Sequence, residues 1–173
     1  MNHKLDISFR PVTTNDLPIL GEWLNYEHWR RYWGNPDEEL ELIRQMVAGH
    51  DTTRPFMFSV DGQVMGYIQY WFVGHHQNRS WVNKYPWLQA LPSEAVGIDL
   101  SIGKSKYLSK GIGTQTLNQF IERLSQLGYT NFVIDPDPQN KRAIRAYEKA
   151  GFSPITSLQD KNEDVLLMQY TIH

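Results

Sequence analysis

Residues 108–114 have the sequence L-S-K-G-I-G-T, and this run does most to decide the fold. It joins the apolar, alternating segment 96–101, which predicts a strand, to a segment whose apolar residues have helical spacing. Gly111 and Gly113 are one residue apart, so the backbone can bend sharply there without a Cβ in the way. The first amides of the following helix have no partners within the helix, and together with Lys110 they favour an anion such as a diphosphate. The run therefore predicts a strand–turn–helix unit with an anion site at the turn.

The run differs from the two most familiar phosphate-binding motifs. No G-K-[ST] sequence follows it, as a P-loop requires, and Leu117 stands where the third glycine of a G-x-G-x-x-G motif would be. A glycine turn with a purely structural role is therefore the alternative to an anion site.

Apolar periodicity divides the rest of the chain into further elements. Alternation of apolar and polar residues predicts strands at 7–10, 56–60, 64–70, 96–101, 132–134 and 165–172. Spacings of three and four residues predict helices that begin near residues 13, 35, 114 and 140. The polar and aromatic stretch 74–95 has no clear period, which is typical of a functional loop or a disordered segment. The pattern predicts a mixed α/β (α+β) arrangement around one sheet, with a strand–helix–strand crossover between residues 99 and 134.

The composition excludes several classes of protein. The chain of 173 residues has no cysteine, which excludes disulfide scaffolds, thiol nucleophiles and cysteine-based zinc sites. Its formal net charge of −2 gives no basic surface for nucleic acid or an anionic membrane. No apolar run approaches the roughly 20 residues of a membrane span, no export signal is present, and the histidines lack metal-site spacing. We expect one cytoplasmic domain over residues 1–173, a monomer or homodimer, with no metal, nucleic-acid or membrane partner.

A second motif follows the glycine run. Residues 135–138 are D-P-D-P, and residues 140–152 are N-K-R-A-I-R-A-Y-E-K-A-G-F. Taken with residues 108–114, this pairing resembles the GCN5-related N-acetyltransferase (GNAT) superfamily, in which a [QR]-x-x-G-x-[GA] loop binds the pyrophosphate of acetyl-coenzyme A and an N-x-x-A-x-x-x-Y-x-K-x-G-F helix flanks the thioester. Leu108 departs from this pattern, because the superfamily usually has Gln or Arg there.

Further matches resemble one subgroup, the aminoglycoside 6′-N-acetyltransferases. They are G-I-D-L-S-I-G at 97–103, E-W-L-N at 22–25, Y-W-G at 32–34 and G-Y-x-Q at 66–69. The resemblance runs from residue 7 to 152 and is weakest over 74–95. It implies a GNAT fold, with a mixed central sheet of about six or seven strands flanked by about four helices. Siderophore-biosynthetic lysine acyltransferases share much of this framework.

The resemblance implies that acetyl-coenzyme A is the cosubstrate. The backbone of residues 100–102 is expected to pair with its pantetheine arm, and one of these amides to stabilise the oxyanion. Asn140 is expected to contact the cofactor as well as to cap its helix, although capping alone would explain it. The expected cofactor-binding residues are Leu100, Ser101, Ile102, Lys110, Gly111, Ile112, Gly113, Thr114, Asn140, Ala143 and Tyr147.

Two residues are expected to be catalytic. Asp99 lies within an apolar strand, so its carboxylate must be solvated, paired or turned toward a cleft. The resemblance places it at the substrate amine, where it would orient the ammonium group and accept its proton; an outward polar strand residue is the alternative. Tyr147 corresponds to a tyrosine beside the sulfur, which implies a general acid for the leaving thiolate. Its alternative is a core aromatic residue, because it shares a face with Ala143 and Ile144.

The substrate is expected to be a small cationic amine, an aminoglycoside. Asp135 ends a strand before a proline, where it would face the cation or, alternatively, form an Asx-type turn. Trp33, Tyr70 and Trp71, with Trp81 and Trp87 as further candidates, are expected to form walls for sugar rings and ammonium groups. The acids of residues 37–41 are interpreted first as a solvated helix start and second as a cation-attracting rim.

The sequence therefore predicts acetyl-coenzyme A-dependent transfer to the 6′-amine of an aminoglycoside, directly within a ternary complex. One alternative is acylation of another small amine, such as a siderophore-type hydroxylysine or a polyamine. A second alternative is a non-catalytic module that binds acyl-coenzyme A as a sensor.

Overall fold

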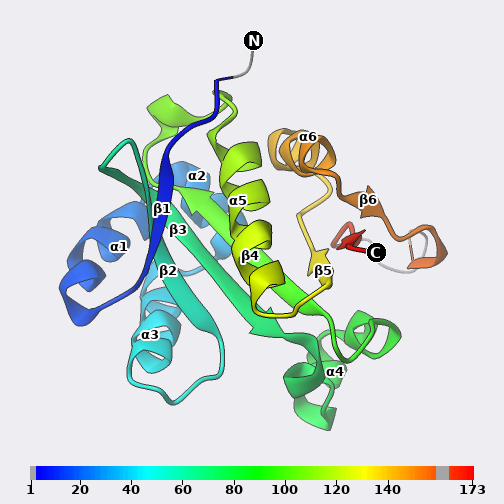
Figure 1. Ribbon diagram of the computed structural model, residues 1–173. Helices are drawn as coiled ribbons and strands as arrows, with labels where there is room; N and C mark the ends of the chain where they lie inside the picture. Colours follow the sequence, from blue (N-terminus) through cyan, green and yellow to red (C-terminus); the bar gives the residue numbers. More distant parts are fainter. Residues whose placement is uncertain (1–2, 159–163) are drawn as a thin grey trace.

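A computed structural model describes residues 3–158 and 164–173 of the chain. Within this part, one mixed sheet has the strand order β1-β2-β3-β4-β5-β7-β6, and every neighbouring pair is antiparallel except β4 and β5 (Figure 1). The strands are β1 (Ile7–Pro11), β2 (Arg54–Val60), β3 (Gln63–Phe72), β4 (Val96–Ile102), β5 (Asn131–Ile134), β6 (Ser153–Pro154) and β7 (Met168–Thr171). The expected mixed sheet is therefore confirmed, and the closing strand is shorter than residues 165–172.

Helices cover both faces of the sheet. They are α1 (Leu17–Leu24), α2 (Glu27–Trp33), α3 (Pro36–Val47), α4 (Arg79–Lys84), α5 (Ile112–Gln126) and α6 (Lys141–Ala150). Figure 1 shows α5 lying across one face of the strands, with α1, α2 and α3 on the opposite side. The two short helices α2 and α4 go beyond the four expected from periodicity, because seven and six residues are too few for a clear helical pattern. No helix in the described part has the length and apolar character needed to cross a bilayer.

Local sequence signals explain where several elements begin and turn. The hairpin between β2 and β3 turns at Asp61 and Gly62, both with positive φ, as a D-G turn of this length favours. The side chain of Asn35 accepts hydrogen bonds from the amides of Asp37 and Glu38 and so begins α3. Asn140 caps α6 in the same way through the amide of Ala143, at 3.3 Å.

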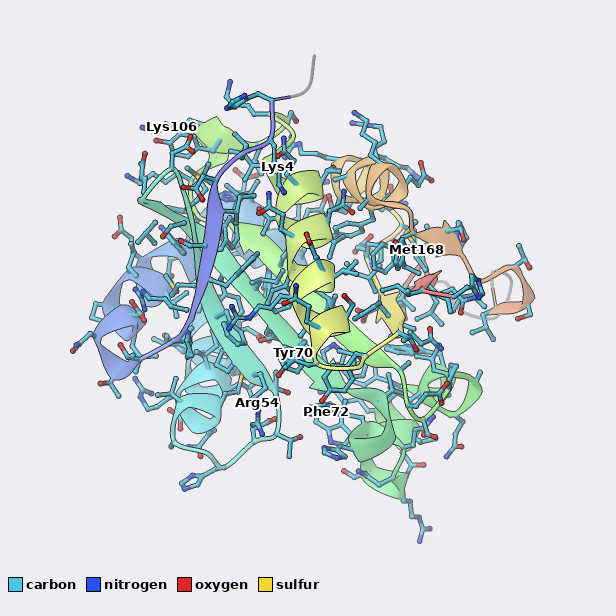
Figure 2. The ribbon with its side chains drawn as sticks, in the orientation of Figure 1. Lys4, Arg54, Tyr70, Phe72, Lys106 and Met168 are labelled. Atoms are coloured by element: carbon cyan, nitrogen blue, oxygen red, sulfur yellow. The ribbon has the colours of Figure 1, made fainter. Side chains whose placement is uncertain are left out.

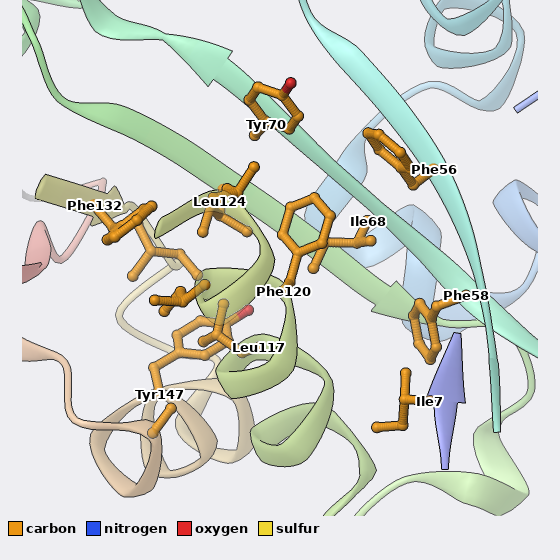
Figure 3. Close-up of a cluster of buried hydrophobic side chains, with 14 of the residues drawn as sticks. Ile7, Phe56, Phe58, Ile68, Tyr70, Leu117, Phe120, Leu124, Phe132 and Tyr147 are labelled. Atoms are coloured by element: carbon orange, nitrogen blue, oxygen red, sulfur yellow. The ribbon is translucent and has the colours of Figure 1, made fainter. Parts of the chain in front are cut away.

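Alternation along β3 assigns its side chains to two different environments. Ile68 and Tyr70 belong to the core beneath α5, where Figure 3 shows Phe120 of that helix among the aromatic side chains of the sheet. Tyr67 belongs instead to the core formed with α1, α2 and α3. Gln69 points to the same face as Tyr67 because strand residues alternate, and its partner across the ladder is Asp99 of β4. The polar pair therefore lies on the face away from α5.

The parallel strands β4 and β5 pair over a very short length. Among the residues that the structure describes, the two strands pair only at Val96–Phe132 and Gly97–Val133, although β4 continues to Ile102 and remains paired with β3 over that length. Beyond residue 97, β4 therefore has a strand neighbour on one side only. The separation opens the sheet between the second half of β4 and the end of β5.

A substitution of Gly66 tests the close packing of β3 against its neighbours. A Cβ at this position would lie 2.5 Å from the backbone oxygen of Ser101 and 2.5 Å from the ring of Phe58. Gly66→Ala should therefore destabilise the fold by about 1–3 kcal/mol, because the backbone of β4 cannot move aside without breaking the ladder. Urea denaturation measures the effect. The control is Gly113→Ala, where an added Cβ meets nothing within 4 Å; equal midpoints for the two variants would contradict the prediction.

Candidate active site

A cleft of about 1120 Å³ lies where β4 separates from β5, and it extends along α2, the loop before α5, and α6. It brings together most of the residues expected to bind the cofactor, together with one expected substrate residue. These are Trp33, Leu100, Ser101, Ile102, Lys110, Gly111, Gly113, Thr114, Asn140, Ala143 and Tyr147. Ile112 is the exception, because its side chain is buried in the core and leaves only its backbone near the cleft.

The glycine run forms the mouth of this cleft. Gly111 is the N-cap of α5 and adopts a left-handed conformation with φ of 80°, and Ser109 also has positive φ. No side chain caps the first amides of α5, so they remain available to an anion in the cleft. A Cβ at Gly111 or Gly113 would meet no protein atom within 4 Å, so both glycines border open space. The geometry fits a ligand phosphate that approaches the backbone closely.

Helix α6 forms the opposite wall and is tied to α5. The hydroxyl of Thr114 donates a hydrogen bond to the carbonyl oxygen of Ala146 at 3.0 Å. Ala143 and Tyr147, four residues apart, lie on the same side of α6 and both line the cleft. Thr114 was expected at the cofactor, and its hydroxyl is already occupied in holding the two helices together.

Asp99 and Asp135 lie together beyond the end of the short β4–β5 ladder. Both residues are half-buried, and their carboxyl groups lie close enough for each to shift the pKa of the other. Desolvation raises the pKa of Asp99, whereas hydrogen bonds from Gln69 and Trp71 lower it. Desolvation also raises the pKa of Asp135 well above its usual range, and the negative charge of Asp99 adds to that effect. The pair therefore holds a proton more tightly than isolated carboxyl groups do.

Tyr147 connects the cleft to the carboxyl pair. Its side chain is 8% exposed, and it lines the cleft from α6. Burial raises its pKa above the ordinary value, and the charges of Asp99 and Asp135 raise it further. The phenol therefore stays protonated and has a proton to donate. Asp99 and Asp135 do not line the cleft. Tyr147 therefore separates the cofactor side of the site from the side that holds these two carboxyl groups, which we call the acidic side.

Two residues of the acidic side have roles that the sequence analysis missed. The hydroxyl of Tyr67 donates a hydrogen bond to Oε1 of Gln69 at 2.5 Å, and Nε2 of Gln69 donates to Oδ2 of Asp99 at 3.0 Å. Both residues are buried, Tyr67 completely. The sequence signal was a glutamine inside an otherwise apolar strand, and burial of an amide requires such partners.

Glu39 is a further acid that the sequence analysis undervalued. Residues 37–41 were interpreted first as a solvated face, which describes Asp37, Glu38 and Glu41, all exposed. Glu39 is half-buried, and its pKa is raised to about 7 by desolvation and then by the charges of Asp99 and Glu38, while Lys84 lowers it. Helix α3 therefore contributes a third carboxyl group to the acidic side, in keeping with the second interpretation, a cation-attracting rim.

The expected aromatic walls separate into different environments. Trp33 lines the cleft and packs against Trp29 and Tyr67, with ring centroids 5.4 and 5.7 Å away. Trp71 lies on the acidic side, where its indole occupies the space that a side chain at Gly97 would need.

Tyr70 is a correction to the sequence analysis. It packs into the core with Phe56 and Phe120 on the face of the sheet opposite Gln69. Figure 2 shows it near the C-terminal end of α5, far from Lys106 and the loop at the other end of that helix. Its side chain is therefore part of the core and not a wall of the site, because it alternates with Gln69 and Trp71 along β3.

The stretch 74–95 folds over the acidic side with short helical turns. It contains α4 and two 3₁₀ turns, Val73–His76 and Pro86–Ala90. Its aromatic rings continue outward from Trp71, with centroid distances of 5.1 Å to His76 and then 4.9 Å from His76 to Trp81. In the described ranges, no group of three or more His, Asp or Glu residues is placed to hold a metal ion.

The family model described as an acetyltransferase (GNAT) domain matches residues 12–159. The aminoglycoside N(6′)-acetyltransferase type 1 of Klebsiella pneumoniae is 30% identical over 158 residues, which cover 87% of this chain and 76% of that protein.

Solved structures agree with this result. Aminoglycoside acetyltransferase AAC(6′)-Ib in complex with coenzyme A and kanamycin has a TM-score of 0.78 and 28% identity, covering 96% of this chain and 95% of that one. An uncharacterised protein from Bacillus halodurans has a TM-score of 0.76 at 28% identity, covering 96% of this chain and 84% of that one.

The raised pKa of Glu39 predicts a pH-dependent stability. The folded protein binds the Glu39 proton up to about pH 7, whereas the unfolded chain releases it near the ordinary value of 4.5. The folded state therefore holds more protons between these values, and stability falls as the pH rises through this window. Glu39→Gln removes this loss and should be more stable than the wild type by about 1–2 kcal/mol at pH 8, after discounting for solvent screening, and equally stable at pH 4.

Thermal unfolding of both proteins between pH 4 and pH 8 measures the difference. Glu122→Gln, at an exposed position of α5, is the matched control and should follow the wild type. A constant offset between Glu39→Gln and the wild type at all pH values would contradict the prediction.

Proposed function

The chain belongs to the GNAT acetyltransferase family, and on this basis we propose that it transfers the acetyl group of acetyl-coenzyme A to the 6′-amine of aminoglycosides. The observation that carries the proposal is the position of the carboxyl pair Asp99–Asp135 at Tyr147, where the open cleft meets the acidic side. Transfer from a thioester to an amine needs a place for each reactant and a path for two protons. This arrangement supplies both.

The residues of the cleft fit the cofactor. The uncapped amides of α5 and the open space at Gly111 and Gly113 suit the diphosphate. The side of β4 that β5 leaves unpaired, at residues 98–102, suits the amides of a pantetheine arm, which would add to the sheet as a strand does. When bound, acetyl-coenzyme A supplies an activated acetyl carbonyl and a thiolate leaving group.

We assign the proton steps to Asp99 and Tyr147. Asp99 orients the substrate ammonium group and takes its proton, which requires a carboxylate near the reacting nitrogen. Tyr147 remains protonated because burial and the neighbouring carboxylate charges raise its pKa, and we assign its hydroxyl as the donor to the sulfur as negative charge develops there. We expect a backbone amide among residues 100–102 to stabilise the carbonyl oxygen. Holding both reactants in line contributes about 7–11 kcal/mol toward the barrier.

The acidic side favours a substrate with several positive charges. Asp99, Asp135 and Glu39 come from β4, the end of β5 and α3, so they approach a ligand from three elements. Desolvated carboxyl groups without cations are unfavourable, and ammonium groups relieve that cost. Trp71 and the aromatic rings of 74–95 provide flat surfaces beside them, which suit sugar rings. A polyamine shares the charge but not the need for flat walls.

A thiol-release assay with acetyl-coenzyme A tests the proposal. Neomycin has an amine at C6′ where paromomycin has a hydroxyl, and the two are otherwise the same. We therefore expect release of the coenzyme A thiol with neomycin and not with paromomycin. Spermidine and N6-hydroxylysine complete the panel. Release with either of these and not with neomycin would overturn the substrate assignment, and cofactor binding without any release would favour a sensor.

Asp99→Asn tests the assignment of the base. The amide cannot accept the ammonium proton, so kcat/KM for neomycin should fall by about 10²–10⁴-fold while coenzyme A still binds. Initial rates and calorimetry separate the two effects. A variant with wild-type kcat/KM would remove Asp99 from this role.

Gly113→Ala tests the cradle for the diphosphate. The new methyl group projects into the open space of the cleft and would interfere with close approach of a phosphate to the backbone. The affinity for coenzyme A should fall about tenfold, equivalent to one lost hydrogen bond, while stability stays equal or rises because alanine favours the helix. Calorimetry with coenzyme A measures the affinity, and an unchanged dissociation constant would show that the loop is only a turn.

A further inference from the structure

The side-chain amide of Gln69 is held in one orientation. Tyr67 is completely buried, and its hydroxyl must donate a hydrogen bond. Two acceptors are within reach, Oε1 of Gln69 at 2.5 Å and the sulfur of Met46 at 3.7 Å. A thioether is a weak acceptor, so the hydroxyl donates to Gln69. The Nε2 group of Gln69 therefore faces Asp99, where it lies 3.0 Å from Oδ2.

This orientation restricts the protonation of the carboxyl pair. The NH₂ group of an amide only donates, and a carboxylate accepts such a hydrogen bond more strongly than a neutral carboxylic acid does, so Gln69 stabilises the ionised form of Asp99. A proton retained by the pair is then favoured on Asp135, whose pKa desolvation and the charge of Asp99 raise. We infer that Gln69, oriented by Tyr67, is a positioning residue that sets the order of ionisation in the pair, so that Asp99 is the carboxylate and Asp135 the acid in the free protein.

The electrostatics of the site agree with this order. The hydrogen bond from Gln69 is the first of the influences that lower the pKa of Asp99 against desolvation. The interaction between the carboxyl groups acts in the same sense, because it lowers the pKa of Asp99 and raises that of Asp135. The base therefore meets the substrate ammonium group already ionised.

Other charged or titratable groups face Asp99 from several elements. They are His76 after β3, Glu39 on α3 and Tyr147 on α6, besides Asp135. His76 lowers the pKa of Asp99 when it is positively charged, whereas Glu39 and Asp99 repel each other when both are ionised. These groups are unchanged when position 69 alone is replaced. A difference between the wild type and a variant at this position therefore reports on Gln69.

Carbon NMR of protein labelled at the aspartate carboxyl carbons tests the order directly, without substrate. Signals are assigned with Asp99→Asn and Asp135→Asn. In the wild type, the Asp99 signal should be that of a carboxylate at pH 7 and the Asp135 signal that of an acid. Asp135 ionised beside a protonated Asp99 would overturn the inference, whatever the acetylation assay shows.

Kinetics test the positioning role, which rests on the proposed function through the use of Asp99 as the base. Gln69→Leu removes the hydrogen bond to Asp99, so the acidic limb of the pH profile of kcat/KM for neomycin should move up by about one to two pH units. Tyr67→Phe keeps the fold and frees the amide to turn, and should give a smaller shift in the same direction. Where Gln69→Leu fails to fold, Tyr67→Phe carries the test.

The matched control is Gln63→Leu, on the same strand. Gln63 also bonds a tyrosine hydroxyl, that of Tyr107, at 3.2 Å on the exposed surface, and its replacement should leave the profile unchanged. Reduced activity in Gln69→Leu with an unshifted pH profile would show a merely structural role and overturn the inference. Absence of acetylation in the wild type would contradict the proposed function. The NMR experiment uses no substrate, so it would still decide the order of ionisation.

Discussion

The short pairing between β4 and β5 is the constraint on which the rest of the structure depends. Two residue pairs hold the parallel strands together, and beyond Gly97 they separate. A fully paired sheet would fill this space with backbone and side chains and leave no room for a ligand between the strands. Because the pairing stops, β4 keeps one free edge toward the cleft, and Asp99 and Asp135 come together without a ladder between them. The core beneath α5 contains residues of both β4 and β5, so side-chain packing on that face continues across the interruption in the sheet.

Neighbouring donors stabilise part of the acidic side. Desolvation of two carboxyl groups and a phenol is unfavourable, and Gln69 and Trp71 offset part of the cost at Asp99. Within residues 3–158 and 164–173, no comparable donor from another side chain lowers the pKa of Asp135, which lies well above its usual range. The site thus carries an electrostatic cost in the absence of a cation. Such a cost is the expected result when residues are selected for binding rather than for stability.

Local patterns predicted the parts of this site that are local in sequence. The glycine run and the capped helix from Asn140 each lie within about a dozen residues, so both motifs could be recognised, and the resemblance that they carry led to the expectation of Gly111, Gly113 and Tyr147 at one cofactor cleft, whose lining contains all three. Glu39 is 60 residues from Asp99, and no pattern within α3 distinguishes it from its exposed neighbours. Tyr70 was misassigned although the strand was predicted correctly. Following the alternation from Ile68 would have turned its ring into the core, since aromatic character alone does not tell which face of a sheet a residue occupies.

The contact between Trp71 and Gly97 restricts how this site can change over evolutionary time. The indole occupies the volume of any side chain at residue 97, so a larger residue there demands a smaller one at 71 in the same lineage. Either substitution alone is expected to lower stability. A smaller residue at position 71 leaves a void beside Asp99, and a larger residue at position 97 displaces the indole. Diversification of the acceptor pocket is therefore expected to proceed through other positions, such as the surface of residues 74–95, while these two vary together.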